Sequence, residues 1–255
     1  MSKLGSAKEF FSKHAEGYAK SESHARGSDL ARLIELAKPA GTDVVLDVAT
    51  GTGFTAVDFA PLVREVVAVD ITDEMLEQAR RLASERGIKN IRFGYADACK
   101  KLPFSDSSFD IITCRRAAHH FTDMQVFLSE TRRVLQKSGR LCIVDMSPQE
   151  GGQEFANKIE RQRDSTHVRA RTASEWLKEL AEAGFRVRDL ELLPDRVSFE
   201  KWLYPVALGG KEEEEVRTAW GEASKEILDL FEANRDEKGE IQDWIKPRVI
   251  LVAVR

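Results

Sequence analysis

Residues 47–56 read DVATGTGFTA and contain two overlapping glycine patterns. From Gly51 the stretch reads G-x-G-x-x-A, a form of the fingerprint that binds the pyrophosphate of NAD or FAD. From Asp47 it is a carboxylate at the end of an apolar strand, followed by a glycine turn. A carboxylate would repel a pyrophosphate, whereas it would attract a ligand with a cationic end. The two patterns predict different ligands at the same place, the carboxyl edge of a sheet.

The bulk properties limit the class of protein. The 255 residues carry a net charge of -4, with 42% apolar and 32% charged residues. This length suits one domain, and the negative charge gives no electrostatic reason to bind nucleic acid. Without an apolar signal segment or a run of 18 apolar residues, we expect a cytoplasmic protein with no membrane partner. Widely spaced Cys99, Cys114 and Cys142 form no metal-ligand pattern, so we expect no metal and buried, reduced thiols at Cys114 and Cys142.

Apolar runs alternate with helical patterns from residue 28 onward, which is typical of an α/β fold with helices on both faces of a parallel sheet. Ser28 or Asp29 is expected to cap the first of these helices, and Thr172 with Glu175 forms a capping box. A helix over 122–136 is expected to end in a turn at 137–139, and residues 198–245 are expected to be helical. We expect seven strands, at 44–48, 66–70, 91–96, 110–115, 140–146, 185–192 and 247–255.

Three carboxylates follow three successive predicted strands, namely Asp47, Asp70 and Asp97. Asp70 can accept hydrogen bonds from both hydroxyls of a ribose, which suits NAD and S-adenosylmethionine equally. Asp97 can accept from the exocyclic amine of adenine while the backbone of Ala98 reaches the ring. The ammonium of S-adenosylmethionine complements Asp47. The three acidic positions together favour S-adenosylmethionine over NAD.

Five motifs occur in order over residues 28–147: VLDVATGTG, VVAVDITDEML, NIRFGYADACKKLPF, FDIITCRRAAHHF and LQKSGRLCIVDM. In these the chain resembles the class I S-adenosylmethionine-dependent methyltransferases, specifically the ubiquinone and menaquinone biosynthesis C-methyltransferases. Within that group it is most similar to the YcgJ-like methyltransferases, through CRRAAHHF and RDSTHVRARTASEW. The resemblance implies a Rossmann-like seven-stranded sheet with an antiparallel last strand and with helical lid insertions. We expect the C-terminal strand to lie at an edge of the sheet. The resemblance also implies S-adenosylhomocysteine as a product.

The resemblance implies roles for individual residues. Asp47, Ala49 and Gly51 would line the methionine end of the cofactor, beside Gly53 in the same turn. Asp70 would hold the ribose, Ile71 and Met75 would pack on the adenine, and Asp97 with Ala98 would contact its edge. Arg115 and Tyr18 complete the predicted cofactor-binding residues.

One position departs from the family. Its usual turn is D/E-x-G-x-G-x-G, and Ala49 stands where the first glycine normally lies. An alanine is tolerated there if its φ is negative and is costly if the position requires a positive φ. We expect a negative φ.

The acceptor end is predicted from the segment after the fourth strand, which contains His119 and His120. An imidazole suits general base catalysis near neutral pH, and the two side chains are expected to point in different directions. Either histidine is a candidate catalytic residue; positioning of the cofactor and structural hydrogen bonding are the alternatives. Without further ligands the two are not a metal site.

We expect one domain over 1–255, in which two kinds of segment cover the site. Phe11, Tyr18 and His24 belong to an N-terminal helical lid at 1–40, or else to a helix packed on the sheet. Arg161, Arg163, His167, Arg169 and Arg171 could bind a carboxylate or phosphate of the acceptor, or else form surface ion pairs. The remaining divisions are a cofactor-binding core at 41–147, acceptor-covering insertions at 148–171 and 198–245, and closing elements at 172–197 and 246–255.

The favoured function is transfer of a methyl group by in-line displacement to a small-molecule acceptor, without a nucleic acid partner. The aromatic residues Trp202, Tyr204, Trp220 and Phe231 in 198–245 are expected to enclose that acceptor. Three alternatives remain open: a non-catalytic S-adenosylmethionine sensor, an NAD-dependent oxidoreductase, and a nucleic acid methyltransferase. The last lacks the Asn/Asp-Pro-Pro-Tyr motif of amino-methylating DNA enzymes.

Overall fold

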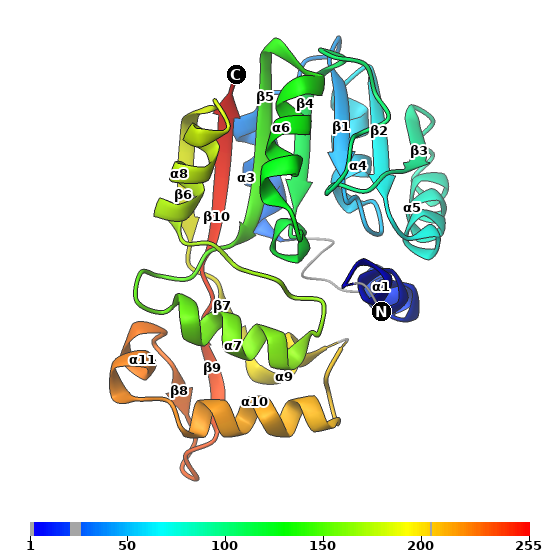
Figure 1. Ribbon diagram of the computed structural model, residues 1–255. Helices are drawn as coiled ribbons and strands as arrows, with labels where there is room; N and C mark the ends of the chain where they lie inside the picture. Colours follow the sequence, from blue (N-terminus) through cyan, green and yellow to red (C-terminus); the bar gives the residue numbers. More distant parts are fainter. Residues whose placement is uncertain (1–2, 21–26, 205) are drawn as a thin grey trace.

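The computed structural model describes residues 3–20, 27–204 and 206–255, and these contain one central seven-stranded sheet (Figure 1). The strand order is β3-β2-β1-β4-β5-β10-β6, and each predicted strand is present. The strands are β1 (Val44–Val48), β2 (Glu65–Asp70), β3 (Ile91–Tyr95), β4 (Phe109–Arg115), β5 (Leu135–Met146), β6 (Arg186–Leu193) and β10 (Arg248–Val254).

The last strand is antiparallel, as predicted. Strands β1 to β5 pair in parallel, and β10 runs opposite to both of its neighbours. The expectation that the last strand forms a sheet edge was wrong, because β10 lies between β5 and β6. Its continuous apolar run, buried at residues 249–253, fits a strand covered on both faces. The turn expected at 137–139 was also wrong, since these residues belong to β5.

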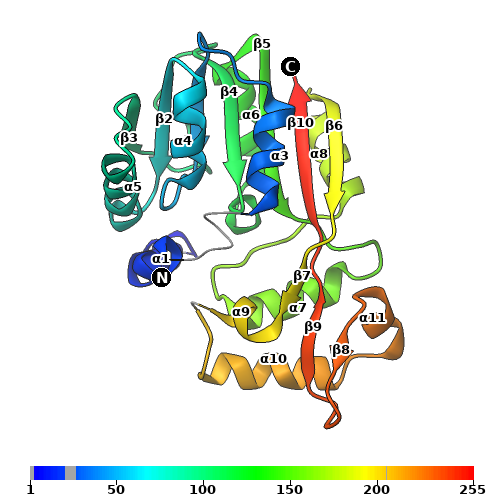
Figure 2. The ribbon, with the colours of Figure 1, turned by 180° about the vertical axis from the view of Figure 1, so that it is seen from behind.

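Helices cover both faces of the sheet, as Figures 1 and 2 show from opposite sides. Successive side chains of β1 point to opposite faces of the sheet. Leu46 packs in one buried cluster with Phe127 of α6 (Met124–Val134), and Val45 packs in the other with Leu33 of α3 (Ser28–Ala37). Cys114 and Cys142 are free and buried, one in each cluster, as expected. The helices of these layers are α3 (Ser28–Ala37), α4 (Phe54–Phe59) with the short 3₁₀ helix at Ala60–Leu62, α5 (Asp73–Glu85), α6 (Met124–Val134) and α8 (Ala173–Glu182).

One of the two predicted caps is confirmed. The capping box of Thr172 and Glu175 is present at α8. Ser28 and Asp29 do not cap α3, whose N-cap is Gly27 without a side-chain hydrogen bond. The carboxylate of Asp29 is instead turned into the protein, where it binds two arginines.

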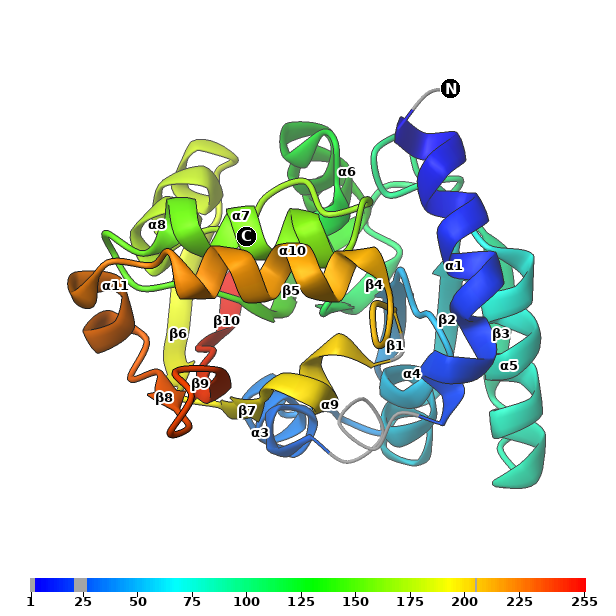
Figure 3. The same ribbon diagram turned by 90° about the horizontal axis from the view of Figure 1, so that it is seen from below.

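A second layer of structure lies beyond the carboxyl ends of β1, β2 and β4 (Figures 1 and 3). Residues 198–245 were expected to be helical, but the described part contains a three-stranded sheet in the order β7-β9-β8. These strands have five residues or fewer, too short for an alternating pattern to stand out from the sequence. The elements are α1 (Lys3–Ala19), α7 (Gln153–Arg163), β7 (Arg196–Ser198), α9 (Phe199–Leu203), α10 (Lys211–Gly221), α11 (Lys225–Leu230), β8 (Asn234–Arg235) and β9 (Ile241–Ile245).

Candidate active site

The glycine turn between β1 and α4 lies at the carboxyl edge of the sheet. Gly51 and Gly53 have φ values of 53° and 87°. A Cβ at Gly53 would lie 2.7 Å from the Cβ of Ala79 on α5, so a glycine is needed for this close approach of α4 and α5. Gly51 lines the main pocket, whereas Gly53 is not among the lining residues.

Ala49 has a φ of 54°, so the expected negative φ was wrong. The chain must turn sharply here, because the next residue, Thr50, donates its backbone N–H to the carbonyl of Val69 at 3.0 Å. An alanine in the left-handed region costs about 1–2 kcal/mol, because its Cβ crowds the backbone. The departure from the family pattern therefore stores strain in the turn.

Replacing Ala49 with glycine should raise the free energy of unfolding by about 1 kcal/mol, after allowing for the larger backbone entropy of unfolded glycine. For a chain of this size that is a rise in Tm of roughly 2–4 °C, measurable by thermal unfolding. Ala60, with a φ of -52°, supplies the matched control, since Ala60→Gly should lower the Tm. An unchanged or lower Tm for Ala49→Gly would contradict strain at this position.

Asp47 is a buried carboxylate, 1% exposed, that lines the pocket. Its Oδ2 accepts a hydrogen bond from the hydroxyl of Thr50 at 2.6 Å, and its Oδ1 accepts from the hydroxyl of Thr113 at 2.6 Å. Burial raises the pKa of Asp47 to about 6, against the opposing effect of these hydroxyls. A buried carboxylate held in this way is stabilised by a cationic ligand group.

Asp70 fastens the end of β2 to the glycine turn. Its Oδ2 accepts from the backbone N–H of Gly51 at 2.9 Å, and its Oδ1 accepts from that of Thr72 at 3.0 Å. Burial raises the pKa of Asp70, and these backbone donors oppose the shift. Because a carboxylate oxygen has two lone pairs, each can still accept from a ligand hydroxyl.

Asp97 presents a buried acceptor to the same edge. Its Oδ1 accepts from the backbone N–H of Cys99 at 2.9 Å. Its Oδ2 is buried without a hydrogen bond among the described residues, and the Nζ of Lys100 lies 3.5 Å from it. A buried acceptor without a hydrogen bond is costly, so this atom fits a ligand that supplies an N–H donor.

A cavity of about 370 Å³ joins the three carboxylates to residues of α1 and of the segment after α7. Its size is that of a small-molecule site. Gly53 and His119 are the predicted site residues that do not line it. Those that do are Tyr18, Asp47, Ala49, Gly51, Asp70, Ile71, Met75, Asp97, Ala98, Arg115 and His120.

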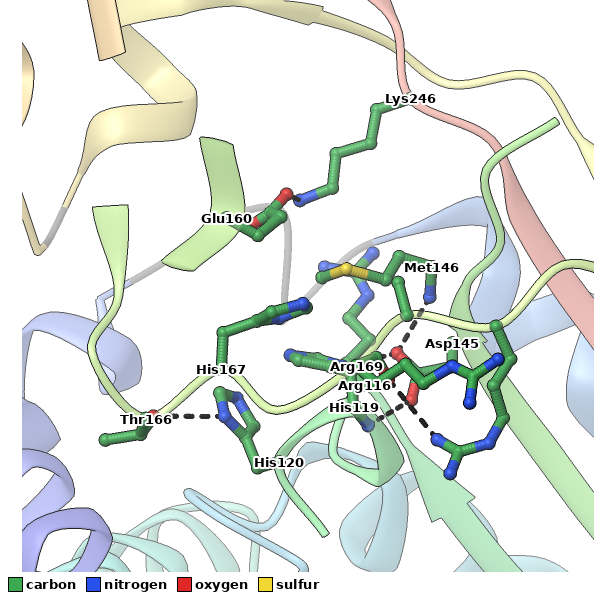
Figure 4. Close-up of polar contacts among 12 residues, drawn as sticks. Arg116, His119, His120, Asp145, Met146, Glu160, Thr166, His167, Arg169 and Lys246 are labelled. Carbon is green, nitrogen blue, oxygen red and sulfur yellow. Dashed lines mark hydrogen bonds and ion pairs between the residues drawn. The ribbon is translucent and has the colours of Figure 1, made fainter. Parts of the chain in front are cut away.

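The two adjacent histidines take different places, as expected (Figure 4). His119 is 8% exposed and bonds to Asp145 of β5 through its Nδ1 at 2.5 Å and its backbone N–H at 2.9 Å. His120 lines the pocket, and its Nδ1 lies 3.0 Å from the hydroxyl of Thr166. Burial, and then the neighbouring His119, lower the pKa of His120 to about 4, so its ring is neutral at pH 7.

Most arginines of the 161–171 cluster form ion pairs. The alternative interpretation expected surface pairs with Glu154, Glu160 and Asp164, but only the pair with Glu160 is present in the part of the chain that the structure describes, and Arg171 is buried. Arg163 lies 3.8 Å from Glu160, Arg169 pairs with Glu175, and Arg171 pairs with Glu179 at 2.6 Å. Arg161 differs, because it lines the pocket and forms no ion pair with a residue that the structure describes. His167 also lines the pocket, and its Nε2 bonds to Asn157 at 2.7 Å.

Helix α1 covers part of the pocket. Phe11 and Tyr18 line it, and the ring of Phe11 contacts that of His120 edge-on at 5.0 Å between centroids. Burial raises the pKa of Tyr18, so its hydroxyl remains protonated. His24, expected in the same lid, lies outside the described residues. Helix α3, in contrast, packs on the sheet through Leu33.

The aromatic residues of 198–245 were expected to enclose the acceptor, and this was wrong for the pocket as it stands. Trp202, Trp220 and Phe231 are buried in a separate cluster with Trp244, and Tyr204 is 45% exposed. None of the described residues in 198–245 lines the pocket. These aromatic side chains form the small core of the second layer.

The segment that carries the histidines is held by a buried ion cluster that the sequence did not reveal. Asp29 is 0% exposed and accepts four hydrogen bonds, two from Arg115 and two from Arg116, at 2.9–3.1 Å. Burial alone would raise the pKa of Asp29, but the two guanidinium groups hold it well below its usual range. Arg116 has a φ of 56°, and the paired hydrogen bonds of its guanidinium group to Asp29 help to stabilise this backbone conformation.

Asp145 was also missed, although the sequence contained a usable signal. It ends the apolar run RLCIVDM, as Asp47 and Asp70 end theirs. Carboxylates at successive strand ends meet at one edge of a parallel sheet, so the same reasoning applied to the fifth strand would have placed it beside His119.

Comparison with known proteins shows which protein family the chain belongs to. The model of a methyltransferase domain family matches residues 40–208. The chain belongs to this methyltransferase family. The methyltransferase YcgJ of Bacillus subtilis is 37% identical over 247 residues, which are 96% of this chain and 97% of that protein. The crystal structure of YcgJ has a TM-score of 0.85 at 34% identity, covering 89% of this chain and 97% of that one.

The resemblance that the motifs suggested is confirmed. The ubiquinone/menaquinone biosynthesis C-methyltransferase of Teredinibacter turnerae is 39% identical over 118 residues, or 45% of this methyltransferase and 47% of that protein. A crystal structure described as a SAM-dependent methyltransferase from Aquifex aeolicus has the same fold, with a TM-score of 0.59 at 17% identity, covering 96% of this chain and 98% of that one. The sensor and oxidoreductase alternatives are not favoured. No helix among the described residues of the methyltransferase has the length and apolar character needed to cross a membrane.

Proposed function

We propose that the enzyme methylates a small molecule that binds between His120 and residues 165–168. The observation that supports this most strongly is the continuity of one cavity from the three carboxylates to that segment. Its volume suits a small molecule, and the buried free thiols fit a reducing, cytoplasmic location. The net charge of -4 argues against a nucleic acid as the acceptor.

The cofactor fits the residues present along β1 to β3. Asp47 would meet the ammonium, Asp70 the ribose hydroxyls and Oδ2 of Asp97, which has no hydrogen bond among the described residues, the adenine amine. Ala49, Gly51 and Arg115 would lie along the methionine end, and Ile71 and Met75 would pack on the adenine above Ala98. The sulfonium supplies an activated methyl group, so the protein's task is to align the acceptor and exclude water. The covering elements for this are α1, through Phe11 and Tyr18, and residues 148–171.

The buried Asp47 should make the affinity for S-adenosylmethionine depend on pH. The free enzyme takes up a proton at Asp47 as the pH falls through about 6, and the bound ammonium favours the ionised carboxylate. Binding therefore releases a proton below this pKa, and the affinity should fall by up to about tenfold between pH 6 and pH 5. Isothermal titration calorimetry over this range measures it. Asp47→Asn should bind more weakly and lose the dependence; a steep dependence kept in this variant would contradict the assignment.

Release of S-adenosylhomocysteine tests the proposed class of acceptor. The enzyme and S-adenosylmethionine are mixed with pools of small amines, hydroxyl compounds and carboxylic acids, and in parallel with RNA, DNA or protein. We expect turnover with a small-molecule pool. Turnover only with a macromolecule would contradict the proposal.

A further inference from the structure

A hydrogen-bonded chain behind His120 determines which of its ring nitrogens carries a hydrogen. Thr166 bonds to Asp164 twice, through its hydroxyl at 2.6 Å and its backbone N–H at 2.8 Å, both to Oδ1. The same hydroxyl lies 3.0 Å from Nδ1 of His120. Asp164 and Thr166 are 3% and 7% exposed, so this chain is shielded from water.

A threonine hydroxyl has one hydrogen, and a carboxylate accepts hydrogen bonds without donating. The hydrogen of Thr166 is therefore given to Asp164, and towards His120 the hydroxyl is an acceptor. His120 must donate from Nδ1, which leaves the lone pair on Nε2. The hydrogen bonds described for the ring are to Thr166, and the ring lines the pocket beside the segment proposed for the acceptor.

His119 holds the same tautomer, with its Nδ1 hydrogen given to a carboxylate and a lone pair on Nε2, but it does not face the cavity. Its Nδ1 is bound to Asp145, and the residue is absent from the pocket lining. The contrast separates the two candidate bases of the sequence: His119 anchors the segment on β5, and His120 faces the cavity (Figure 4).

We propose that Nε2 of His120 is the general base for methyl transfer to a hydroxyl or an amine, and that Thr166 and Asp164 are its positioning residues. This rests on the proposed function. As the acceptor's oxygen or nitrogen bonds to the methyl carbon, the carbon–sulfur bond breaks and its electron pair stays on sulfur as S-adenosylhomocysteine. The proton of the acceptor passes to Nε2. The positive charge of the sulfonium thus ends on the imidazolium of His120, which later releases the proton to water.

The surrounding charges fit this order of events. The ring of His119 lies 4.0 Å from that of His120 and 5.6 Å from that of His167. Asp145 and Asp164 are the acidic groups near His120. The lowered pKa of His120 keeps the ring neutral, with its lone pair free, before reaction. Such a weak base takes the proton only as the new bond makes the acceptor's hydrogen strongly acidic. Asp164, through Thr166, then stabilises the charge that develops on the ring.

The first test needs no acceptor. Protein labelled with ¹⁵N in histidine and saturated with S-adenosylhomocysteine is studied by long-range ¹H–¹⁵N NMR, with His120→Gln to assign the signal. We expect His120 to have hydrogen on Nδ1 and a bare Nε2. Thr166→Val should shift it towards the other tautomer, and Thr166→Ser should preserve it. Thr218→Val, a matched change on the exposed face of α10, should have no effect. Hydrogen on Nε2 in the unaltered protein overturns the proposal.

Kinetics with the acceptor found by S-adenosylhomocysteine release give the second test. His120→Gln should lower kcat by about 10²–10⁴-fold without changing the KM for S-adenosylmethionine. Thr166→Val should lower kcat about tenfold, and Thr166→Ser should restore it. Full kcat in His120→Gln overturns the proposal. Failure of S-adenosylhomocysteine to bind at all would instead refute the proposed function, so the two failures are distinguishable.

Discussion

The Asp70→Ala variant is expected to bind S-adenosylmethionine about 100-fold more weakly than the unaltered enzyme. In the proposed assignment, the carboxylate accepts two hydrogen bonds from ribose hydroxyls, each contributing about 1.5–3 kcal/mol, and the variant loses both. Asp70 also anchors the glycine turn through the backbone N–H groups of Gly51 and Thr72, which would be left without this acceptor. Since 1.4 kcal/mol corresponds to a factor of ten, a loss of about 3 kcal/mol gives the stated change. Isothermal titration calorimetry measures it.

Asp73→Ala is the matched control for Asp70→Ala. Asp73 lies three positions further along, its side chain is 71% exposed, and it pairs only loosely with Lys8 at 3.7 Å. Its removal should change the affinity by less than about threefold, because exposed ion pairs contribute little. Circular dichroism confirms that both variants remain folded. Affinity within threefold of the unaltered enzyme in folded Asp70→Ala would refute the assignment of Asp70 to the ribose.

The Asp29→Ala variant is expected to lose about 3–5 kcal/mol of stability, because it leaves two buried guanidinium groups without their shared acceptor. This should lower the Tm by roughly 10 °C for a chain of this size. Arg115 and Arg116 precede His119 and His120 directly, so the effect should reach the pocket as well as the core. Thermal unfolding and the affinity for S-adenosylmethionine report the two consequences.

Glu35→Ala provides the control on the same helix. Glu35 is 64% exposed and pairs with Arg32 at 2.7 Å, so its loss should change stability by less than about 1 kcal/mol. The contribution of Asp29 should also depend on pH. Since its folded pKa is lowered, the stabilisation is present above the ordinary aspartate pKa of about 4 and is lost as the pH falls below it. A Tm for Asp29→Ala equal to that of Glu35→Ala would contradict the buried cluster.

The strands of the sheet and the carboxylates at its carboxyl edge could be predicted from the sequence, because both depend on short, local patterns. A buried strand ending in a carboxylate identifies its own place in a parallel sheet, and the glycine turn marks the strand that begins the site. This placed Asp47, Asp70 and Asp97 along one pocket without any knowledge of long-range contacts.

The predictions that were wrong concern features that depend on contacts between residues far apart in the sequence. Asp29 appears as a helix cap because the arginines that bind it are more than 80 positions away. The φ of Ala49 is set by the neighbouring strand, and alanine itself carries no signal for a positive value. The aromatic residues of 198–245 could equally line a ligand or a small core, and their packing on Trp244 decided for the core.

The most direct test of the account is a crystal structure with S-adenosylhomocysteine bound. The account predicts the amino end at Asp47, the ribose on Asp70 and the adenine amine at Oδ2 of Asp97. The sulfur would then face Nε2 of His120 across the cavity. A ligand bound outside this cavity, or one whose sulfur points away from His120, would contradict it.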